Sequence, residues 1–432
     1  MPTSSRWRCD KRRSRHVRWP NVTRRGFFRG AGAAAVTGAA VSVLSACTPQ
    51  DDSQIPEPMV VDADRAINVL KEYKEIELDL TAKDEWSIPL GSVLHEGTGM
   101  WIPVTQAGAS ASPMVKGCAL SLDDGSLSEV VPDVIGDSHT VVIYDTRCSD
   151  EVYAWVELDY LTHAWTLYAA RFNKGTLDGS ATALWQADAN YDPPGFACAG
   201  NSVIWQIAPA LSGNKTVEHS FCYIWKVGSE SAKEVVESPG RFAIAPSISN
   251  DVVILAPRVR EKEGVYYGVT AYSLNDDLST IVDQLVLPQT VRPFYATYID
   301  DRFAVSIEAS YSSGGMFGTM GTYIGTSKGP FVSLPREPSA NIAGYDDKFV
   351  VKSRTSYFVI DIKKATYGIL TAANRCVDYG EYPARVGESS DFVTFATVKD
   401  EASGYPHSVT VRTFNLPQLY ATKVDKETGR LS

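Results

Sequence analysis

A repeated turn-and-strand unit constrains the fold of this chain more than any other feature of its sequence. Each copy has a polar turn rich in Asp, Ser, Asn or Gly, followed by a run of β-branched and aromatic residues. The copies begin at Gly97, Ser149, Gly200, Ser249, Asp300, Asp346 and Ser390, so consecutive starts lie 52, 51, 49, 51, 46 and 44 residues apart. A period of this length indicates one structural unit stacked on copies of itself.

The remainder of each unit also predicts strands. After a variable loop, two apolar runs flank a tight turn, as in residues 118–131, 272–282 and 357–370. About four strands per unit is the pattern of a β-propeller, in which stacked sheets bury one another's faces and a closed ring protects the strand edges. We therefore expect an all-β fold, a seven-bladed β-propeller over residues 86–424. Two β-sandwich domains are the alternative, but they do not explain the even spacing.

These repeats resemble the seven-bladed propellers of the PQQ-binding-like or TolB-like kind, over about residues 86–424. The resemblance is one of architecture, because the turns are too varied for WD40 or kelch repeats. Residues 121–126 partly resemble the sialidase Asp-box, but Leu127 and Ser128 stand where a Thr and an aromatic residue are expected. An ordinary hairpin turn is the better interpretation. The resemblance identifies no function, and the sequence implies no cofactor.

The first 46 residues have the features of an export signal. Residues 23–29 resemble the bacterial twin-arginine signature, with Arg24 and Arg25 as the paired arginines, and a mildly apolar run follows. Residues 44–47, Leu-Ser-Ala-Cys, resemble the lipobox of bacterial lipoproteins. That resemblance implies cleavage before Cys47 and a diacylglycerol on its thiol. The alternative is a chance cysteine in a protein left soluble after cleavage.

These signals predict the organisation of the whole chain. We expect a signal peptide at 1–46, a lipidated tether at 47–64, a helix-and-strand extension at 65–85, the propeller at 86–424 and a tail at 425–432. In the extension, residues 65–74 have helical spacing and residues 76–80 alternate as a strand. That strand would either pair with the last blade and help to close the ring or lie on an outer edge. The lipid would place the protein at the outer face of the bacterial cytoplasmic membrane.

Charge limits the partners of the mature chain. The full chain has 41 Lys and Arg and 51 Asp and Glu, and residues 1–46 contain ten of the basic residues and one of the acidic ones. The mature chain therefore carries 31 basic and 50 acidic residues, a net charge of −19. Such an acidic surface argues against nucleic acid and against docking on anionic lipid. The predicted membrane link is the lipid on Cys47.

No catalytic or metal-binding motif stands out. The chain has no HExxH or CxxC motif, and its histidines are scattered. Paired carboxylates such as Asp123–Asp124 fall in predicted hairpin turns, where Asp is favoured for its backbone hydrogen bonds. Five cysteines remain after Cys9 and Cys47, and we interpret them as buried thiols rather than as a disulfide framework. We therefore predict no catalytic residue and no metal ligand.

The loops that enter the predicted blades carry a candidate ligand site. They contain His139, Tyr191, Arg241, Arg292, Asn341 and Arg385. Three arginines near one rim of an acidic protein predict a site for a carboxylate or phosphate, because a guanidinium donates in a two-pronged geometry. The alternative is that each arginine pairs with local carboxylates or carbonyls.

A long loop between the second and third strands of one repeat is a candidate partner surface. Residues 308–321 are rich in glycine and contain Tyr311, Met316, Phe317 and Met320. Adaptable methionines and aromatic residues suit a binding surface. The alternative is a loop that folds over and plugs the channel mouth.

The leading functional hypothesis is a membrane-anchored binding or scaffold module outside the cytoplasm. It would present a propeller face to an envelope protein or a small anionic ligand. The alternative is an enzyme of lyase, hydrolase or quinone-cofactor type with its site in the channel. An open channel with convergent His, Arg and carboxylates would favour the enzyme, and a channel plugged by side chains would favour the binding module.

Overall fold

The computed structural model describes residues 55–79, 81–110, 113–136, 139–212, 218–373, 376–377 and 380–419. All of them belong to one compact unit. The predicted export signal at Arg24 and Arg25, the predicted lipidation site at Cys47 and the predicted tail at 425–432 lie outside the described residues.

Strand pairing groups the described strands into seven sheets, which we number in chain order. Sheet 1 contains β4 (Ser92–Leu94), β5 (Trp101–Ala107), β6 (Met114–Ser121) and β7 (Leu127–Val131). Sheet 2 contains β8 (Val141–Cys148), β9 (Val152–Asp159), β10 (Trp165–Asn173) and β11 (Thr176–Ala187). Sheet 3 contains β12 (Phe196–Ala199), β13 (Ser202–Ile207), β14 (Ser220–Lys226) and β15 (Lys233–Ser238). Sheet 4 contains β16 (Ser247–Ser249), β17 (Val252–Leu255), β18 (Arg258–Val259), β19 (Tyr266–Ser273) and β20 (Ile281–Val286).

The last three sheets each include a strand from the N-terminal part of the chain. Sheet 5 contains β21 (Tyr295–Ile299), β22 (Arg302–Ile307), β23 (Gly321–Gly325), β24 (Phe331–Leu334) and β1 (Ile67–Asn68). Sheet 6 contains β30 (Gly387–Glu388), β25 (Ala343–Tyr345), β26 (Lys348–Ser353), β27 (Ser356–Asp361), β28 (Thr366–Thr371) and β2 (Lys74–Glu75). Sheet 7 contains β29 (Tyr382–Pro383), β31 (Asp391–Lys399), β32 (Pro406–Asn415) and β3 (Asp84–Pro89).

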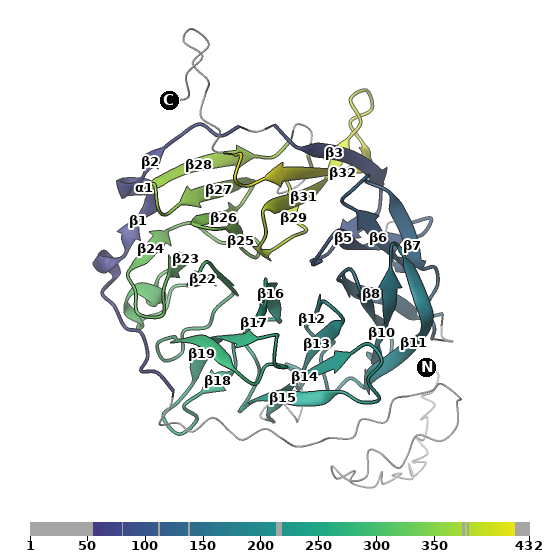
Figure 1. Ribbon diagram of the computed structural model, residues 1–432, viewed down its shortest axis with the longest axis horizontal. Coiled ribbons are helices and arrows are strands. Elements are labelled where there is room, and N and C mark those ends of the chain that lie inside the picture. Colours follow the sequence, from purple (N-terminus) through teal and green to yellow (C-terminus); the bar gives the residue numbers. More distant parts are fainter. Residues whose placement is uncertain are drawn as a thin grey trace, which may run out of the picture. The chain divides into compact units, whose positions relative to one another are not determined.

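The sheets surround a central axis, so the predicted all-β propeller fold is confirmed (Figure 1). The first strands β12 and β16 lie near the centre, and β11 and β15 lie at the periphery (Figure 1). Clusters of buried apolar side chains join each sheet to the next, and one of them joins sheet 7 to sheet 1. In that last cluster Val393 and Val411 of sheet 7 accompany Ile102 and Leu120 of sheet 1. Burial between faces is therefore the main force that holds the ring together.

The N-terminal segment runs along the outer edges of sheets 4 to 7 (Figure 1). The amide of Met59 donates to the carbonyl of Val286 (2.9 Å), and β1 and β2 then pair in parallel with β24 and β28. Next, β3 pairs antiparallel with β32, before the chain enters sheet 1. The last sheet thus combines strands from both ends of the propeller, and this pairing closes the ring.

Two expectations for this segment need correction. The helix α1 covers only Val69–Glu72, because Ile67 and Asn68 pair with β24 and the Asn68 side chain accepts from the amide of Leu70. Residues 76–79 form no strand, and the strand that pairs with sheet 7 is β3 instead. The alternation at 76–80 reflects the packing of Leu78, which is buried between sheets 6 and 7.

The expectation that the apolar loop is a partner surface is wrong for Met316 and Phe317. They lie on the short 3-10 helix η4 (Gly315–Gly318) and are 1% and 0% exposed in the cluster between sheets 4 and 5. Phe317 packs edge-to-face on Tyr323 and Phe331, with ring centroids 5.2 Å apart in both pairs. Tyr311 is partly buried against the same cluster, and Met320 is partly exposed. The loop folds inward because burial of its large apolar side chains is more favourable in free energy than their exposure to water.

The five described cysteines are free thiols. Cys118, Cys148, Cys198 and Cys222 are buried, and Cys376 is partly exposed. Burial raises the pKa of Cys118 to about 11 and also raises the pKa of Cys148 and Cys198. These buried thiols therefore stay protonated at neutral pH and have low nucleophilicity.

Candidate functional site

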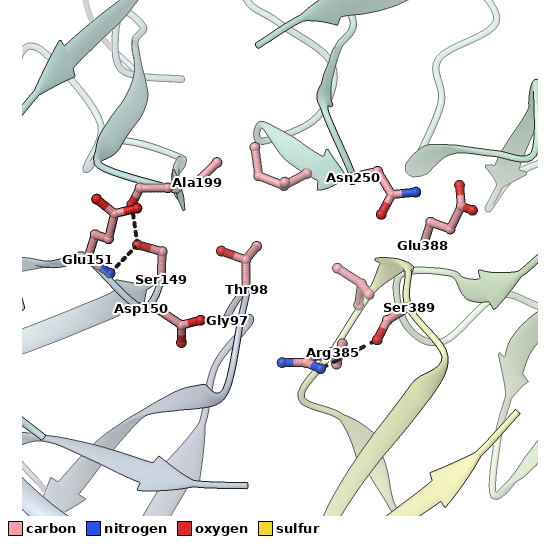
Figure 2. A pocket seen from close by; sticks show the side chains of 14 residues that line it. Gly97, Thr98, Ser149, Asp150, Glu151, Ala199, Asn250, Arg385, Glu388 and Ser389 are labelled. Atoms are coloured by element: carbon pink, nitrogen blue, oxygen red, sulfur yellow. Dashed lines mark hydrogen bonds between the residues drawn. The ribbon is translucent and has the colours of Figure 1, made fainter. Parts of the chain in front are cut away.

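A pocket of about 320 Å³ lies where the first hairpins of several sheets converge (Figure 2). Its walls come from the turns at 97–99, 149–151, 199–200 and 248–250 and from the segment 385–389 before β31. The first four turns each precede the second strand of sheets 1 to 4, so the pocket lies at one end of the inner strands. Its volume falls within the range of small-ligand sites, which is about 300–1,000 Å³.

Hydrogen bonds between neighbouring turns hold these walls together. The Thr98 hydroxyl donates to the carbonyl of Cys198 (3.0 Å), and the Glu388 amide donates to the Ser249 hydroxyl (2.9 Å). Gly387 has a φ of 72°, and a Cβ there would lie 2.1 Å from the carbonyl oxygen of Ile248. Glycine is therefore required where β30 of sheet 6 passes close to the turn of sheet 4.

Arg385 supplies a nearly buried cation to the pocket. Its side chain is 7% exposed, and Nη1 donates to the Ser389 hydroxyl over 3.4 Å. The second terminal nitrogen, Nη2, is buried and has no hydrogen-bond partner among the described residues. Burial lowers the pKa of Arg385, although the nearby carboxylates of Asp391 and Asp150 oppose this shift. Nη2 of Arg385 therefore lacks the hydrogen bond that a buried donor ordinarily makes.

Carboxylates line other parts of the same pocket. Asp150 accepts a hydrogen bond from the Met100 amide (2.7 Å) and sits over Gly99, where a Cβ would lie 2.4 Å from the carboxyl group. Glu388 accepts from the Asp300 amide (3.3 Å), and burial raises its pKa. Asp150 and Arg385 project toward the middle of the pocket from different walls (Figure 2). The pocket therefore offers charges of both signs.

A second polar cluster lies on the inner strands of sheets 1 and 2, just before the turns of these sheets that line the pocket. His95 Nδ1 lies 3.0 Å from Asp145 Oδ1, and its Nε2 lies 2.8 Å from the Thr105 hydroxyl. The Arg147 guanidinium donates to the same Asp145 carboxylate. Burial alone would raise the pKa of Asp145, but Arg147 and His95 lower it to about 2. This cluster ties sheet 1 to sheet 2.

Asn341 extends this cluster to sheet 6. Its side-chain amide donates to Glu96 Oε1 over 3.4 Å, and Asn341 lies just before β25 whereas Glu96 follows β4. Burial raises the pKa of Glu96, although Arg147 counteracts part of the shift. Side chains from sheets 1 and 6 thus meet, and both ring nitrogens of His95 are bonded. The cluster has the residue types of an active site, but its hydrogen-bonding capacity is largely used within the protein.

The six predicted rim residues do not gather at one site. Arg241 pairs with Asp192 (2.7 Å) and donates to the Pro209 carbonyl, and Tyr191 forms a β-bridge with Pro209. Exposed Arg292 donates to the Ala243 carbonyl (3.3 Å), and His139 is exposed in a turn. Local pairing, the alternative considered above, therefore describes Arg241 and Arg292.

Chain geometry explains why Arg385 is different. The strand before the turn at Ser389 rises about 3.3 Å per residue. Arg385 lies five residues before the repeat start at Ser390, whereas Arg241 lies eight residues before the equivalent position at Ser249. Arg385 therefore reaches the turn end of the ring and lines the pocket, and none of the other five predicted rim residues lines it.

Sequence reasoning missed Asp150 and Glu388, because it identified neither as a candidate ligand-binding residue. The available signal was the repeat itself, since turns at equivalent positions of a propeller converge on one end of the axis. Within the described ranges, no three His, Cys, Asp or Glu side chains come together as a metal site. The helices in this part of the chain are all too short or too polar to cross a membrane.

No known protein family and no curated protein matches this chain. Among solved structures, it is similar to the β-propeller domain of the trilobed protease from Pyrococcus furiosus, at 11% identity and a TM-score of 0.45, over 79% of this chain and 98% of that one. It is also similar to oligogalacturonate lyase from Vibrio parahaemolyticus, at 8% identity and a TM-score of 0.43, over 79% and 98% of the two chains. A prolyl endopeptidase matches at 11% identity and a TM-score of 0.48, over 81% of this chain, which spans only 51% of that enzyme. At these identities the likeness concerns the fold alone.

Proposed function

We propose that this chain is a ligand-binding β-propeller that holds a small carboxylate-bearing molecule in the pocket against Arg385. The observation that carries the proposal is that Arg385 lines a cavity of ligand size, is nearly buried, and has an Nη2 with no hydrogen-bond partner among the described residues. A buried charge is costly unless it is paired. A carboxylate would supply that pairing through two parallel charge-assisted hydrogen bonds.

The ligand would be bound by a β-propeller domain that is carried outside the cytoplasm. We propose that the domain is exported through Arg24 and Arg25 and anchored by a lipid on Cys47 at the outer face of the bacterial cytoplasmic membrane. The order and spacing of the two N-terminal motifs support this placement. In this setting the protein acts as a receptor or scaffold for a small envelope ligand.

An enzyme with its site in the channel has less support. The cluster of His95, Glu96, Asp145 and Arg147 contains suitable residue types, but a general base needs a free nitrogen or oxygen within reach of substrate. His95 is bonded through Nδ1 and Nε2, and Asp145 is bonded by both His95 and Arg147. Binding at Arg385 requires no such rearrangement.

The test is the binding of acetate, as the minimal carboxylate, to the purified chain and to the variant Arg385→Gln. Acetate at millimolar concentration should raise the thermal midpoint of the wild-type protein, because a ligand that binds the native state stabilises it. Arg385→Gln should abolish this rise. Arg292→Gln is the matched control, since it removes the same charge from an exposed arginine outside the pocket. An equal acetate response in Arg385→Gln and wild type would refute the proposal.

A further inference from the structure

The charges of the pocket restrict its ligand more narrowly than a carboxylate group alone. Asp150, Glu151 and Glu388 line the same cavity as Arg385, so acidic side chains outnumber the single cation. A ligand with only negative charge would be attracted by Arg385 and repelled by these carboxylates. A ligand that also carries a positive charge escapes this repulsion and gains a second attraction.

The positions of Arg385 and Asp150 fit a ligand with one charge at each end. The two side chains come from different walls, Arg385 from the segment before β31 and Asp150 from the turn between β8 and β9 (Figure 2). They are near enough for Asp150 to affect the ionisation of Arg385, yet no ion pair joins them among the described residues. Asp150 Oδ1 accepts a hydrogen bond from the Met100 amide, and none of the described residues bonds to its other carboxylate oxygen.

We propose that the ligand is a zwitterion, a small amino acid or dipeptide, with its carboxylate on Arg385 and its ammonium group on Asp150. This inference rests on the proposed function, because it assigns the carboxylate to the same site. It adds the amine as a second requirement for recognition. An ammonium group donates three hydrogen bonds and suits a wall of carboxylates.

The volume and lining of the pocket limit the size of the ligand. At roughly 30 Å³ per water molecule, the cavity holds about ten waters, which leaves room for an amino acid or a dipeptide. The walls are mostly short and polar, with Thr98, Asn250 and Ser389 beside several glycines. A short polar side chain therefore fits this lining better than an aromatic one.

Three matched probes separate the two charges of the ligand. L-serine carries both groups, 3-hydroxypropionate lacks the amine, and ethanolamine lacks the carboxylate. Isothermal titration of the full chain should show that L-serine binds at least tenfold more tightly than either of the others. Loss of the carboxylate leaves the nearly buried Arg385 without a partner, and loss of the amine removes the contact with the exposed carboxylate of Asp150.

The variant Asp150→Asn tests the amine contact. Its side-chain oxygen can still accept from the Met100 amide, so the turn is preserved. Asp150→Asn should weaken the binding of L-serine by about tenfold, whereas the affinity for 3-hydroxypropionate should stay equal or increase. Asp123→Asn, in an exposed hairpin turn outside the pocket, is the matched control and should change neither affinity.

The outcomes separate the zwitterion inference from the proposed carboxylate site. Suppose that the binding of L-serine and of 3-hydroxypropionate depends on Arg385, but that the ratio of their affinities is the same in wild type and Asp150→Asn. The zwitterion inference is then overturned, and the carboxylate site stands. If Arg385→Gln changes neither affinity, or if no probe binds the wild-type chain, the proposed function fails together with the inference.

Discussion

Replacement of Phe317 by alanine tests whether the long loop is part of the core. Phe317 is 0% exposed and packs edge-to-face on Tyr323 and Phe331 between sheets 4 and 5. A buried Phe→Ala change costs about 3–5 kcal/mol through lost transfer free energy and the cavity left behind. Two aromatic contacts place Phe317→Ala in the middle of that range or above it, at about 4 kcal/mol.

The free energy of unfolding of Phe317→Ala can be measured by urea titration followed by tryptophan fluorescence. Met320→Ala is the matched control, because Met320 lies in the same loop but is partly exposed. It should cost less than about 1 kcal/mol. A loss below about 1 kcal/mol for both variants would mean that the loop is a solvent-facing surface, and it would refute the burial argument.

The remaining predictions concern buried charges and the membrane anchor. Arg412→Met should destabilise the protein by about 3–5 kcal/mol in urea titrations, because it leaves the Glu381 carboxylate, which is 2% exposed and accepts a hydrogen bond from Arg412 Nη2 over 2.9 Å, without its cation. The double variant with Glu381→Gln should lose less than the sum of the single losses, and additive losses would contradict the pairing. Burial lowers the pKa of Lys352 from 10.5 to about 8. The unfolded chain therefore binds more protons between these values, and the free energy of unfolding should rise from pH 8 to pH 10.5. Lys352→Met should flatten that rise, and an unchanged pH profile would show that Lys352 is not its source. Cys47→Ala should move the protein from the membrane to the soluble fraction of a bacterial envelope preparation, whereas retention in the membrane would exclude the lipid anchor.

The repeat spacing predicted the architecture because each sheet needs the same turn and strand pattern, and this pattern therefore recurs along the chain. Each predicted repeat start lies in or beside the turn before the second strand of a sheet, as Ser149 does before β9 and Asp346 before β26. Asp300 and Asp301 have φ values of 49° and 57°, as a two-residue hairpin turn of type I′ requires. Turn chemistry and strand alternation are local properties, so one sequence was enough to find them.

The surroundings of side chains depend on contacts between distant residues, and the sequence pattern contains less of that information. Met316 and Phe317 look like an exposed apolar loop until the faces of sheets 4 and 5 are placed around them. Arg385 was identified as a candidate, but the pattern placed it with Arg241 and Arg292. It lies between the short strands β29 and β30, at the turn end of the ring, and lines the same pocket as Asp150 from a turn more than 200 residues earlier in the chain.

The most direct test of the central claim is the NMR signal of the Arg385 guanidinium during titration with L-serine. In the wild-type chain with labelled arginine side chains, the Nη protons of Arg385 should shift downfield with ligand concentration, because Nη2 gains a charge-assisted hydrogen bond. The resonance is assigned by its absence in Arg385→Gln, and the Arg292 signal should stay in place. A saturating shift confined to Arg385 is the result predicted here. An Arg385 signal that does not move while L-serine binds would place the ligand elsewhere and contradict the account.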